Sequence, residues 1–102
     1  MTTTDRELLE RAAKAAGYSI RFTSDGTCFR DGPDWMGQWS PLTDDGDEAR
    51  LEAALMLDCR WWPDDVTVGT HSEMYADHGF DKQKARRYAG VRAAAAMAGK
   101  EK

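Results

Sequence analysis

Large aliphatic side chains are scarce in this chain of 102 residues, which has ten leucine, isoleucine and valine residues beside fifteen alanines. No run of about 18 apolar residues occurs, so the sequence predicts no membrane-spanning helix. The N-terminal residues 1–5 are polar and acidic, which is not typical of a secretory signal peptide. We therefore expect a cytoplasmic protein that folds as a single domain over residues 1–102.

Cysteine and histidine are also rare, with two residues of each. Cys28 and Cys59 fall on different predicted strands, and we expect both to be buried free thiols; a disulfide would require that those strands be neighbours. His71 and His78 lack a zinc-binding spacing such as CxxC or HExxH. The sequence therefore predicts solvated histidines, no metal site and no cofactor.

Arrangements that support catalysis are missing as well. The carboxylates lie in polar runs that indicate solvated surfaces, and no pair of them has a predictable separation. Ser72 adjoins His71 but has no G-x-S-x-G motif around it. We therefore predict that the protein is not an enzyme, and we keep a small ligand- or metal-dependent enzyme built around His71 and His78 as an alternative.

Apolar periodicity predicts the element order α-β-β-α-β-β-α. Helices are expected at about residues 4–16, 45–57 and 81–98, and strands at residues 18–23, 27–30, 58–62 and 66–70. Residues 35–39 read as a short strand or an ordered loop, and residues 72–80 read as a loop. Packing of layers then favours an α+β fold with helices on an antiparallel sheet.

The segment 39–51 carries the most specific signal in the chain. Pro41 stops a helix from extending backwards, and Thr43, Asp44 and Asp45 are side chains that cap the first turn of a helix. A calcium-binding EF-hand loop would need oxygen ligands at alternating positions, glycine sixth and glutamate twelfth, and this run does not fit that register. Capping is therefore the favoured interpretation of the acidic run.

This run, W-S-P-L-T-D-D-G-D-E-A-R-L, resembles the W-x-P-L-x-D-D-G-D-A-x-R-L signature of the phage ABA sandwich domain family, and residues 85–95 are similar to that family's last helix. The resemblance implies an α/β/α sandwich with helices on both faces of the sheet. It also implies a small phage or prophage accessory protein without assigned activity or catalytic residues. The chain departs from the family pattern in its tryptophan-rich middle and in residues 72–80, where we expect a function of its own.

Tryptophan is abundant for so short a chain, with residues at Trp35, Trp39, Trp61 and Trp62. Because neighbours on a strand point to opposite faces, a three-layer fold buries both Trp61 and Trp62, which is what the resemblance favours. A two-layer fold leaves one of the two exposed beside Asp64 and Asp65, where it would suit a partner protein.

Charge is unevenly distributed along the chain. Residues 31–65 hold ten acids and two bases, whereas residues 81–102 hold two acids and seven bases. Such asymmetry favours an electrostatic partner. The predicted partner-binding residues are Trp62, Asp64, Asp65, Asp44, Asp45 and Asp47. An alternative nucleic-acid site consists of Lys82, Arg86, Arg87 and Arg92, although a solvated helix face is the favoured interpretation in an acidic chain.

These observations predict a small non-enzymatic phage or prophage accessory protein that acts in the host cytoplasm by binding a host or phage protein complex. An anti-CRISPR-like inhibitor of a host defence complex is one concrete form. A nucleic-acid-associated module that uses the basic C-terminal helix is the alternative, with nucleic acid the less favoured partner. Gly90 and residues 93–96 would allow either close helix packing in a homodimer or packing within the chain.

Overall fold

The computed structural model describes residues 3–31 and 36–99. Within these ranges, no helix combines the length and the apolar character needed to cross a membrane. The elements in chain order are α1 (Thr3–Ala16), β1 (Ile20–Phe22), β2 (Cys28–Asp31), β3 (Met36–Gln38), α2 (Asp45–Leu55), β4 (Cys59–Trp61), β5 (Asp65–Val68), β6 (His71–Met74), the 3₁₀ helix η1 (Tyr75–His78) and α3 (Lys82–Gly99).

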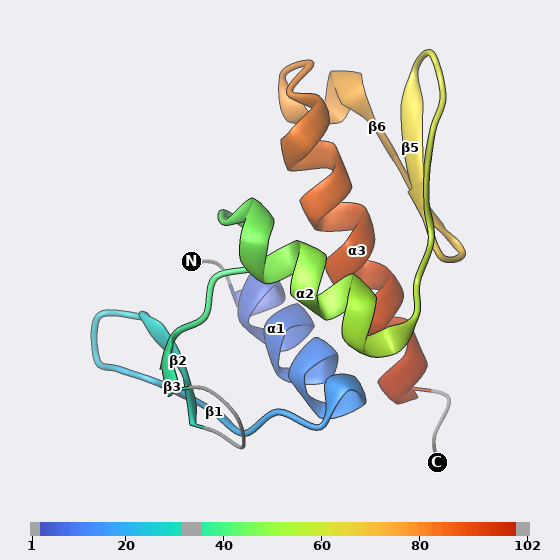
Figure 1. Cartoon of the computed structure of the whole chain (residues 1–102). Coiled ribbons are helices and arrows are strands. Elements are labelled where there is room, and N and C mark those ends of the chain that lie inside the picture. The colour runs from blue at the N-terminus through green and yellow to red at the C-terminus, as the bar shows by residue number, and fades with distance from the viewer. Residues whose placement is uncertain (1–2, 32–35, 100–102) are drawn as a thin grey trace.

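The three helices form the centre of the molecule, and the strands lie at its periphery (Figure 1). Helix α3 packs against both α1 and α2. Leu9 and Ala13 of α1 share one buried cluster with Val91 and Ala94 of α3. Small side chains at these positions let the helices pack closely, which makes a dense core attainable in a chain with few large aliphatic residues.

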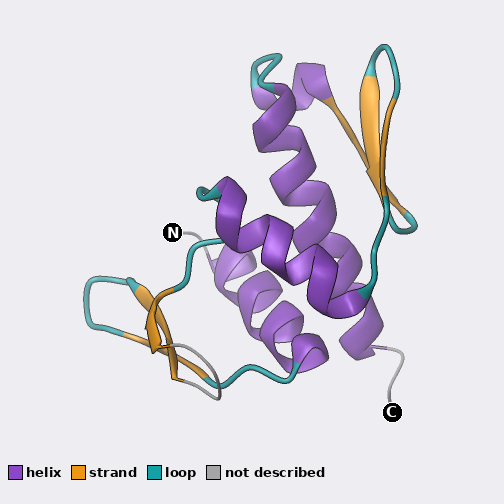
Figure 2. Cartoon of the chain, in the orientation of Figure 1, coloured by secondary structure: helices purple, strands orange, loops and turns teal. Residues whose placement is uncertain are grey.

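Two antiparallel sheets of three strands flank the helices, in the orders β1-β2-β3 and β4-β5-β6 (Figure 2). In the first sheet Phe29 pairs with Arg21 on one side and Gln38 on the other. The second sheet packs on α3, and Val66 and Val68 of β5 form a second buried cluster with side chains of that helix.

The predicted α+β class with antiparallel strands is confirmed, and the observed order is α-β-β-β-α-β-β-β-α. The strands divide between two sheets, whereas the resemblance implied one sheet between two helical layers. Each sheet consists of strands that are consecutive in the chain, and α2 separates the two groups, so local pairing completes each sheet by itself. Cys28 and Cys59 consequently lie in different sheets as free thiols; Cys28 is buried, as predicted, but Cys59 is only partly so.

Residues 72–80, which the sequence predicted to be a loop, contain most of β6 and the 3₁₀ helix η1. Strand β6 has the sequence His-Ser-Glu-Met, without the apolar alternation that identifies a strand. It forms because it pairs with β5 along its whole length, from His71 opposite Val68 to Met74 opposite Asp65. The strand at residues 36–38 confirms one of the two predicted options there, and Trp35 lies outside the described residues.

Helix α2 begins where the acidic run predicted. Asp44 is its N-cap, and the Asp44 carboxylate accepts a hydrogen bond of 2.8 Å from the backbone N–H of Asp47. The helix ends at Leu55, two residues before its predicted end, because Met56 adopts a left-handed conformation with φ of 56°. Asp81 caps α3, accepting from the backbone N–H of Lys84 at 3.0 Å.

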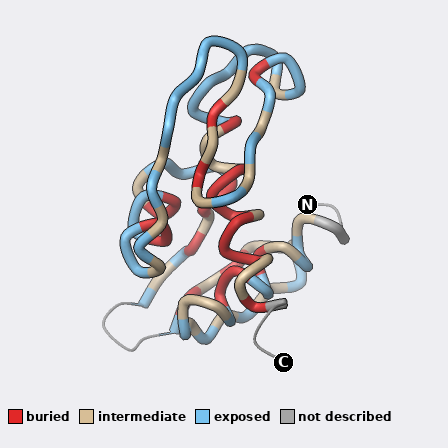
Figure 3. The backbone as a smooth tube through the Cα atoms, turned by 90° about the vertical axis from the view of Figure 1, so that its right-hand side faces the viewer, coloured by how far each residue is buried: buried red, intermediate tan, exposed pale blue. Residues whose placement is uncertain are grey.

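Buried side chains are concentrated where the helices meet (Figure 3). Trp39 is the one fully buried tryptophan of the described residues and packs edge-on against Tyr18, with ring centroids 5.8 Å apart. Gly90, Ala93 and Ala94 on α3 are also buried. That stretch of α3 therefore packs within the chain, which is one of the two kinds of packing that the sequence allowed.

Candidate functional site

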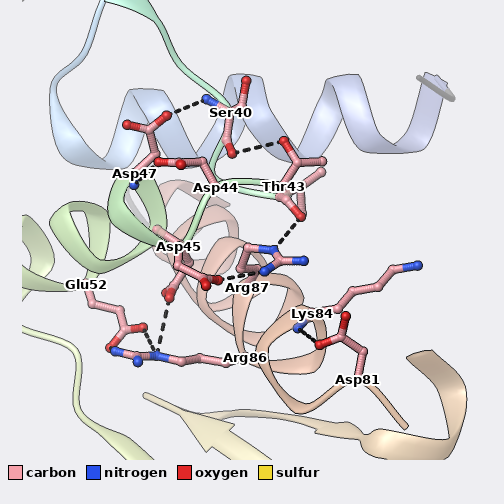
Figure 4. A network of polar contacts seen from close by, with 12 residues as sticks. Ser40, Thr43, Asp44, Asp45, Asp47, Glu52, Asp81, Lys84, Arg86 and Arg87 are labelled. Atoms are coloured by element: carbon pink, nitrogen blue, oxygen red, sulfur yellow. Dashed lines mark hydrogen bonds and ion pairs between the residues drawn. The ribbon is translucent and has the colours of Figure 1, made fainter. Parts of the chain in front are cut away.

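The acidic residues predicted to meet a partner near the start of α2 are engaged within the chain (Figure 4). Asp47 is buried, and its carboxylate accepts from the backbone N–H of Ser40 at 2.8 Å and from Arg50 at 2.6 Å. Asp44 caps the helix, and Asp45 pairs with Arg87 at 2.6 Å. These carboxylates hold the start of α2 in place, and Asp47 lies too deep to meet a partner.

The arginines of α3 are tied to other parts of the chain, so only part of the predicted solvated face remains, with Lys82 and Lys84 exposed. The Arg86 guanidinium makes two hydrogen bonds to the Glu52 carboxylate, at 3.0 and 3.2 Å. Arg87 donates to the Leu42 carbonyl at 2.9 Å as well as pairing with Asp45. Arg92 pairs with Glu73 at 2.5 Å. All three arginines of the predicted nucleic-acid site are thus ion-paired within the chain.

Lys82 completes that predicted set and is the exception. It is exposed at the start of α3, and its ammonium nitrogen lies 5.3 Å from the ring centroid of Tyr75. Among the described residues it has no ion pair within 4.0 Å. A single accessible lysine of this set gives little electrostatic attraction for a nucleic-acid backbone, which proteins bind with several cations.

A pair of glutamates lies buried between α2 and α3. Glu52 is buried, and the Glu48 side chain is only 1% exposed. One Glu48 oxygen lies 3.4 Å from Arg86, while the other faces Gly90 and has no hydrogen-bond partner among the described residues. Burial, assisted by the hydrogen bond and negative charge of Glu52, raises the pKa of Glu48 to about 9 against the opposing charge of Arg86.

His78 contradicts the prediction of two solvated histidines. Its ring lies 2.7 Å from the Glu73 carboxylate and packs on the Tyr88 ring, and the side chains of His78 and Glu73 are both almost covered. Glu73 also holds Arg92, so the cluster ties β6 and η1 to α3. No group of three or more metal-ligating side chains occurs in the part of the chain that the structure describes.

An aromatic surface, defined by Trp61, Trp62, Met74 and Phe80, is the most unusual accessible feature. These side chains are 46, 49, 47 and 76% exposed. The predicted burial of Trp61 and Trp62 is therefore wrong. Among the described residues, α3 packs on one face of the sheet whose edge strand is β4, and no second helical layer covers the other face.

The aromatic surface contains two adjoining hollows. Their volumes are about 370 and 220 Å³. The larger one is lined by Trp61, Trp62, Pro63, Tyr75, Lys82 and Gln83. The smaller one is lined by Pro63, Asp64, Met74, Tyr75, Ala76, Phe80 and Lys82. Because three residues belong to both, the hollows form one continuous depression with Asp64 and Lys82 as its charged groups.

Hydrogen bonds fix the residues around the depression. The Tyr75 hydroxyl donates to the Trp62 carbonyl at 2.8 Å, and the Tyr75 backbone N–H donates to the Asp64 carbonyl at 3.0 Å. The Trp62 indole N–H donates to the Thr67 hydroxyl at 3.1 Å. Trp61 lies beside Arg86, 6.0 Å from its guanidinium carbon. A partner would therefore meet a largely preformed surface.

Phe80 reaches the surface from a strained backbone. It has φ of 63° and follows Gly79, which has φ of 65°. A left-handed conformation is uncommon for a bulky non-glycine residue, and such strain concentrates at functional positions. Exposure of the ring adds a second cost, because the apolar side chain stays in water. Both costs suit a ring whose task is to meet a partner.

Of the predicted partner-binding residues, Trp62 and Asp64 line the depression and Asp65 does not, while Phe80 and Met74 were not among those predicted. Asp64 is exposed at the smaller hollow, and Asp65 is half-buried in β5. Phe80 directly precedes the helix cap Asp81, where an apolar side chain often packs back onto the helix, so the sequence gives no signal of its exposure. No signal marks Met74 either, since β6 lacks the apolar alternation of a strand.

Comparison with protein-family models, with curated proteins and with solved structures finds no match for this chain. The resemblance of residues 39–51 to the phage ABA sandwich domain family therefore stays a prediction. The function has to be argued from the surface and the contacts of the chain itself.

Proposed function

We propose that the protein is a non-enzymatic accessory protein that binds another protein through its aromatic surface. The observation that carries this proposal is where the large apolar side chains lie. The helical core is filled with small residues such as Ala12, Ala89 and Ala94, while Trp61, Trp62 and Phe80 stand in solvent. Large exposed aromatic side chains gathered around a depression are typical of a protein-binding surface.

Charges of both signs surround the depression. Asp64 lies at the smaller hollow, Lys82 lines both hollows, and Arg86 lies beside Trp61. The exposed aromatic rings therefore decide the partner's chemistry more than the charges do. The partner we propose is a protein that inserts an apolar side chain into the depression.

The resemblance to phage accessory proteins supports a host or phage protein complex as that partner, in the cytoplasm of the host cell. Inhibition of a host defence complex is the concrete form that this proposal takes. A basic surface that normally meets nucleic acid would also accept an acidic, tryptophan-bearing protein. Because the arginines of α3 form ion pairs within the chain, this proposal is favoured over direct binding of nucleic acid by the protein.

The variant Phe80→Gly is expected to make the protein more stable and a weaker binder. Glycine relieves the left-handed strain at this position, which should raise the free energy of unfolding by about 1 kcal/mol. Loss of the ring should at the same time lower the amount of partner captured from host-cell lysate. Urea unfolding and quantitative mass spectrometry of the captured proteins measure the two effects.

Met56→Gly is the matched control, because Met56 is also left-handed and is 91% exposed but lies at the end of α2 and lines neither hollow. It should gain stability in the same way and keep its binding. Equal capture by Phe80→Gly and the unchanged protein would contradict the role given to the ring.

A further inference from the structure

Strand β4 forms one edge of the second sheet, next to the aromatic surface. In Figure 1 the yellow-green chain between α2 and β5 runs along the outer side of this sheet. Among the described elements, β5 is the one that packs along β4, whereas α3 and η1 also contact β6 at the opposite edge. The outer edge of β4 is therefore the one at which a further strand has room to pair.

The hydrogen-bond pattern decides which backbone groups of β4 face that edge. The Trp62 N–H donates to the Asp65 carbonyl at 2.9 Å. Bonded and non-bonded residue pairs alternate in an antiparallel ladder, so Arg60 also bonds to β5, whereas Cys59 and Trp61 do not. The N–H and C=O groups of Cys59 and Trp61 therefore point away from the sheet, toward the free edge.

The side chains of β4 alternate between the two faces of the sheet. Trp61 lies opposite Val66, which packs on α3, so the Trp61 ring is on the α3 face, where it lines the larger hollow. Arg60 is exposed on the other face and pairs with the exposed Asp58 at 3.6 Å. A strand added at this edge would thus place one side chain beside Trp61 and the next one beside Arg60.

A second copy of the chain would fit this edge poorly. Antiparallel pairing through Cys59 and Trp61 of both copies places the two Arg60 side chains directly opposite each other, and like charges at such positions are destabilising. Moving the centre of the pairing by one residue brings in Leu57, whose N–H already donates to a carbonyl of α2 at 2.9 Å, or Pro63, which has no N–H. The edge therefore suits a different chain.

We propose that the partner protein adds an extended segment to the free edge of β4 as an antiparallel strand. Its side chains would be apolar opposite Trp61, acidic opposite Arg60 and apolar opposite Cys59. The outward backbone groups supply the hydrogen bonds, and the side chains decide which segments fit. The side chain opposite Trp61 is the one that enters the depression. This inference rests on the proposed function, because it names the form in which that partner meets the aromatic surface.

The probe is the acetylated and amidated peptide Thr-Phe-Glu-Val-Thr, titrated into the full chain and followed by two-dimensional NMR and amide hydrogen exchange. Saturable shifts and slower exchange are expected at the backbone amides of Cys59 and Trp61. A peptide with lysine in place of glutamate should bind about threefold more weakly or less, because its charge opposes Arg60. No saturable shift at peptide concentrations up to about 5 mM would overturn the proposal.

Two N-methylated forms of the peptide isolate the contribution of the backbone. Methyl groups on the phenylalanine and valine nitrogens, which would face β4, should abolish the saturable shifts. Methyl groups on the glutamate and final threonine nitrogens, which would face away, should leave the affinity within about twofold. Both forms have the same composition and charge, so equal binding by the two would overturn the strand pairing.

The readouts separate this inference from the proposed function. Peptide-induced shifts confined to Trp62 and Phe80, without slower exchange at Cys59 and Trp61, would overturn the strand pairing and leave the aromatic surface as the binding site. A dimer of the free protein held together through the Cys59 and Trp61 amides would assign the edge to a second copy and also overturn the proposal. Capture of a partner from lysate tests the proposed function by itself, since it requires no strand pairing.

Discussion

Replacing Gly90 with alanine is expected to lower the free energy of unfolding by about 3 kcal/mol, the upper part of the range for overpacked cores. A Cβ atom at this position would lie 2.0 Å from one Glu48 oxygen and 2.9 Å from the carboxyl carbon. Glu48 is too deeply buried to move aside without leaving Glu52 and Arg86. Chemical unfolding monitored by tryptophan fluorescence measures the change.

Helix propensity alone predicts the opposite sign for the change in the free energy of unfolding. Glycine inside a helix is normally less stable than alanine by about 1 kcal/mol, so without the contact the variant should gain stability. Gly46→Ala, in the first turn of α2, is the control, because its added methyl group would meet side-chain atoms no closer than 3.3 Å. A gain in Gly90→Ala would contradict the close contact between Gly90 and Glu48.

A double-mutant cycle isolates the contact. In the protein that already carries Glu48→Ala, the methyl group added by Gly90→Ala no longer meets a carboxylate and has room. The cost of alanine at Gly90 should therefore fall by more than about 1 kcal/mol in that background. Additive effects of the two changes would show that Gly90 is needed for another reason.

The variant Glu48→Gln is expected to stabilise the protein at pH 8 by at least about 1 kcal/mol, relative to the unchanged chain. Folding raises the pKa of Glu48 from 4.5 to about 9, so the folded protein must take up a proton that the unfolded chain has lost. The stabilisation that this proton gives is fully present below pH 4.5 and is lost as pH rises toward about 9. Glutamine keeps the shape and a hydrogen-bond donor without needing that proton.

The pH dependence provides the check on this expectation. Unfolding curves of the two proteins at intervals from pH 4.5 to pH 9 should diverge steadily, with the glutamine variant gaining on the unchanged chain as pH rises. Glu7→Gln, an exposed acid on α1, is the control and should give a difference that hardly changes over this range. Parallel curves for the Glu48→Gln variant would show that Glu48 is ionised in the folded protein.

Much of the helical framework was predictable because its signals are local. The cap at Asp44, the cap at Asp81 and the left-handed glycine at Gly17 are each decided within a few residues. Strand β6 could not be predicted, since its polar sequence becomes a strand only through pairing with β5. The division into two sheets could not be predicted either, because strand pairing cannot be seen in the sequence. The expected single sheet came from the resemblance to a sandwich family.

The buried charges escaped prediction because each depends on a partner far away in the chain. Glu52 and Arg86 are 34 positions apart, and neither residue type indicates burial by itself. The same limit applies to the aromatic surface. Burial of both Trp61 and Trp62 assumes helices on both faces of the sheet, whereas β4 is an edge strand and both rings are about half exposed.

The central claim is that the aromatic surface binds a partner protein, and capture from host-cell lysate tests it most directly. The comparison uses the unchanged protein, Trp62→Ala, and Met36→Ala as an exposed apolar control outside the depression. Each is measured by quantitative mass spectrometry with and without nuclease. We predict one protein complex that is retained after nuclease treatment, retained by Met36→Ala and lost by Trp62→Ala. Equal capture by all three proteins, or capture that disappears with nuclease, would contradict the claim.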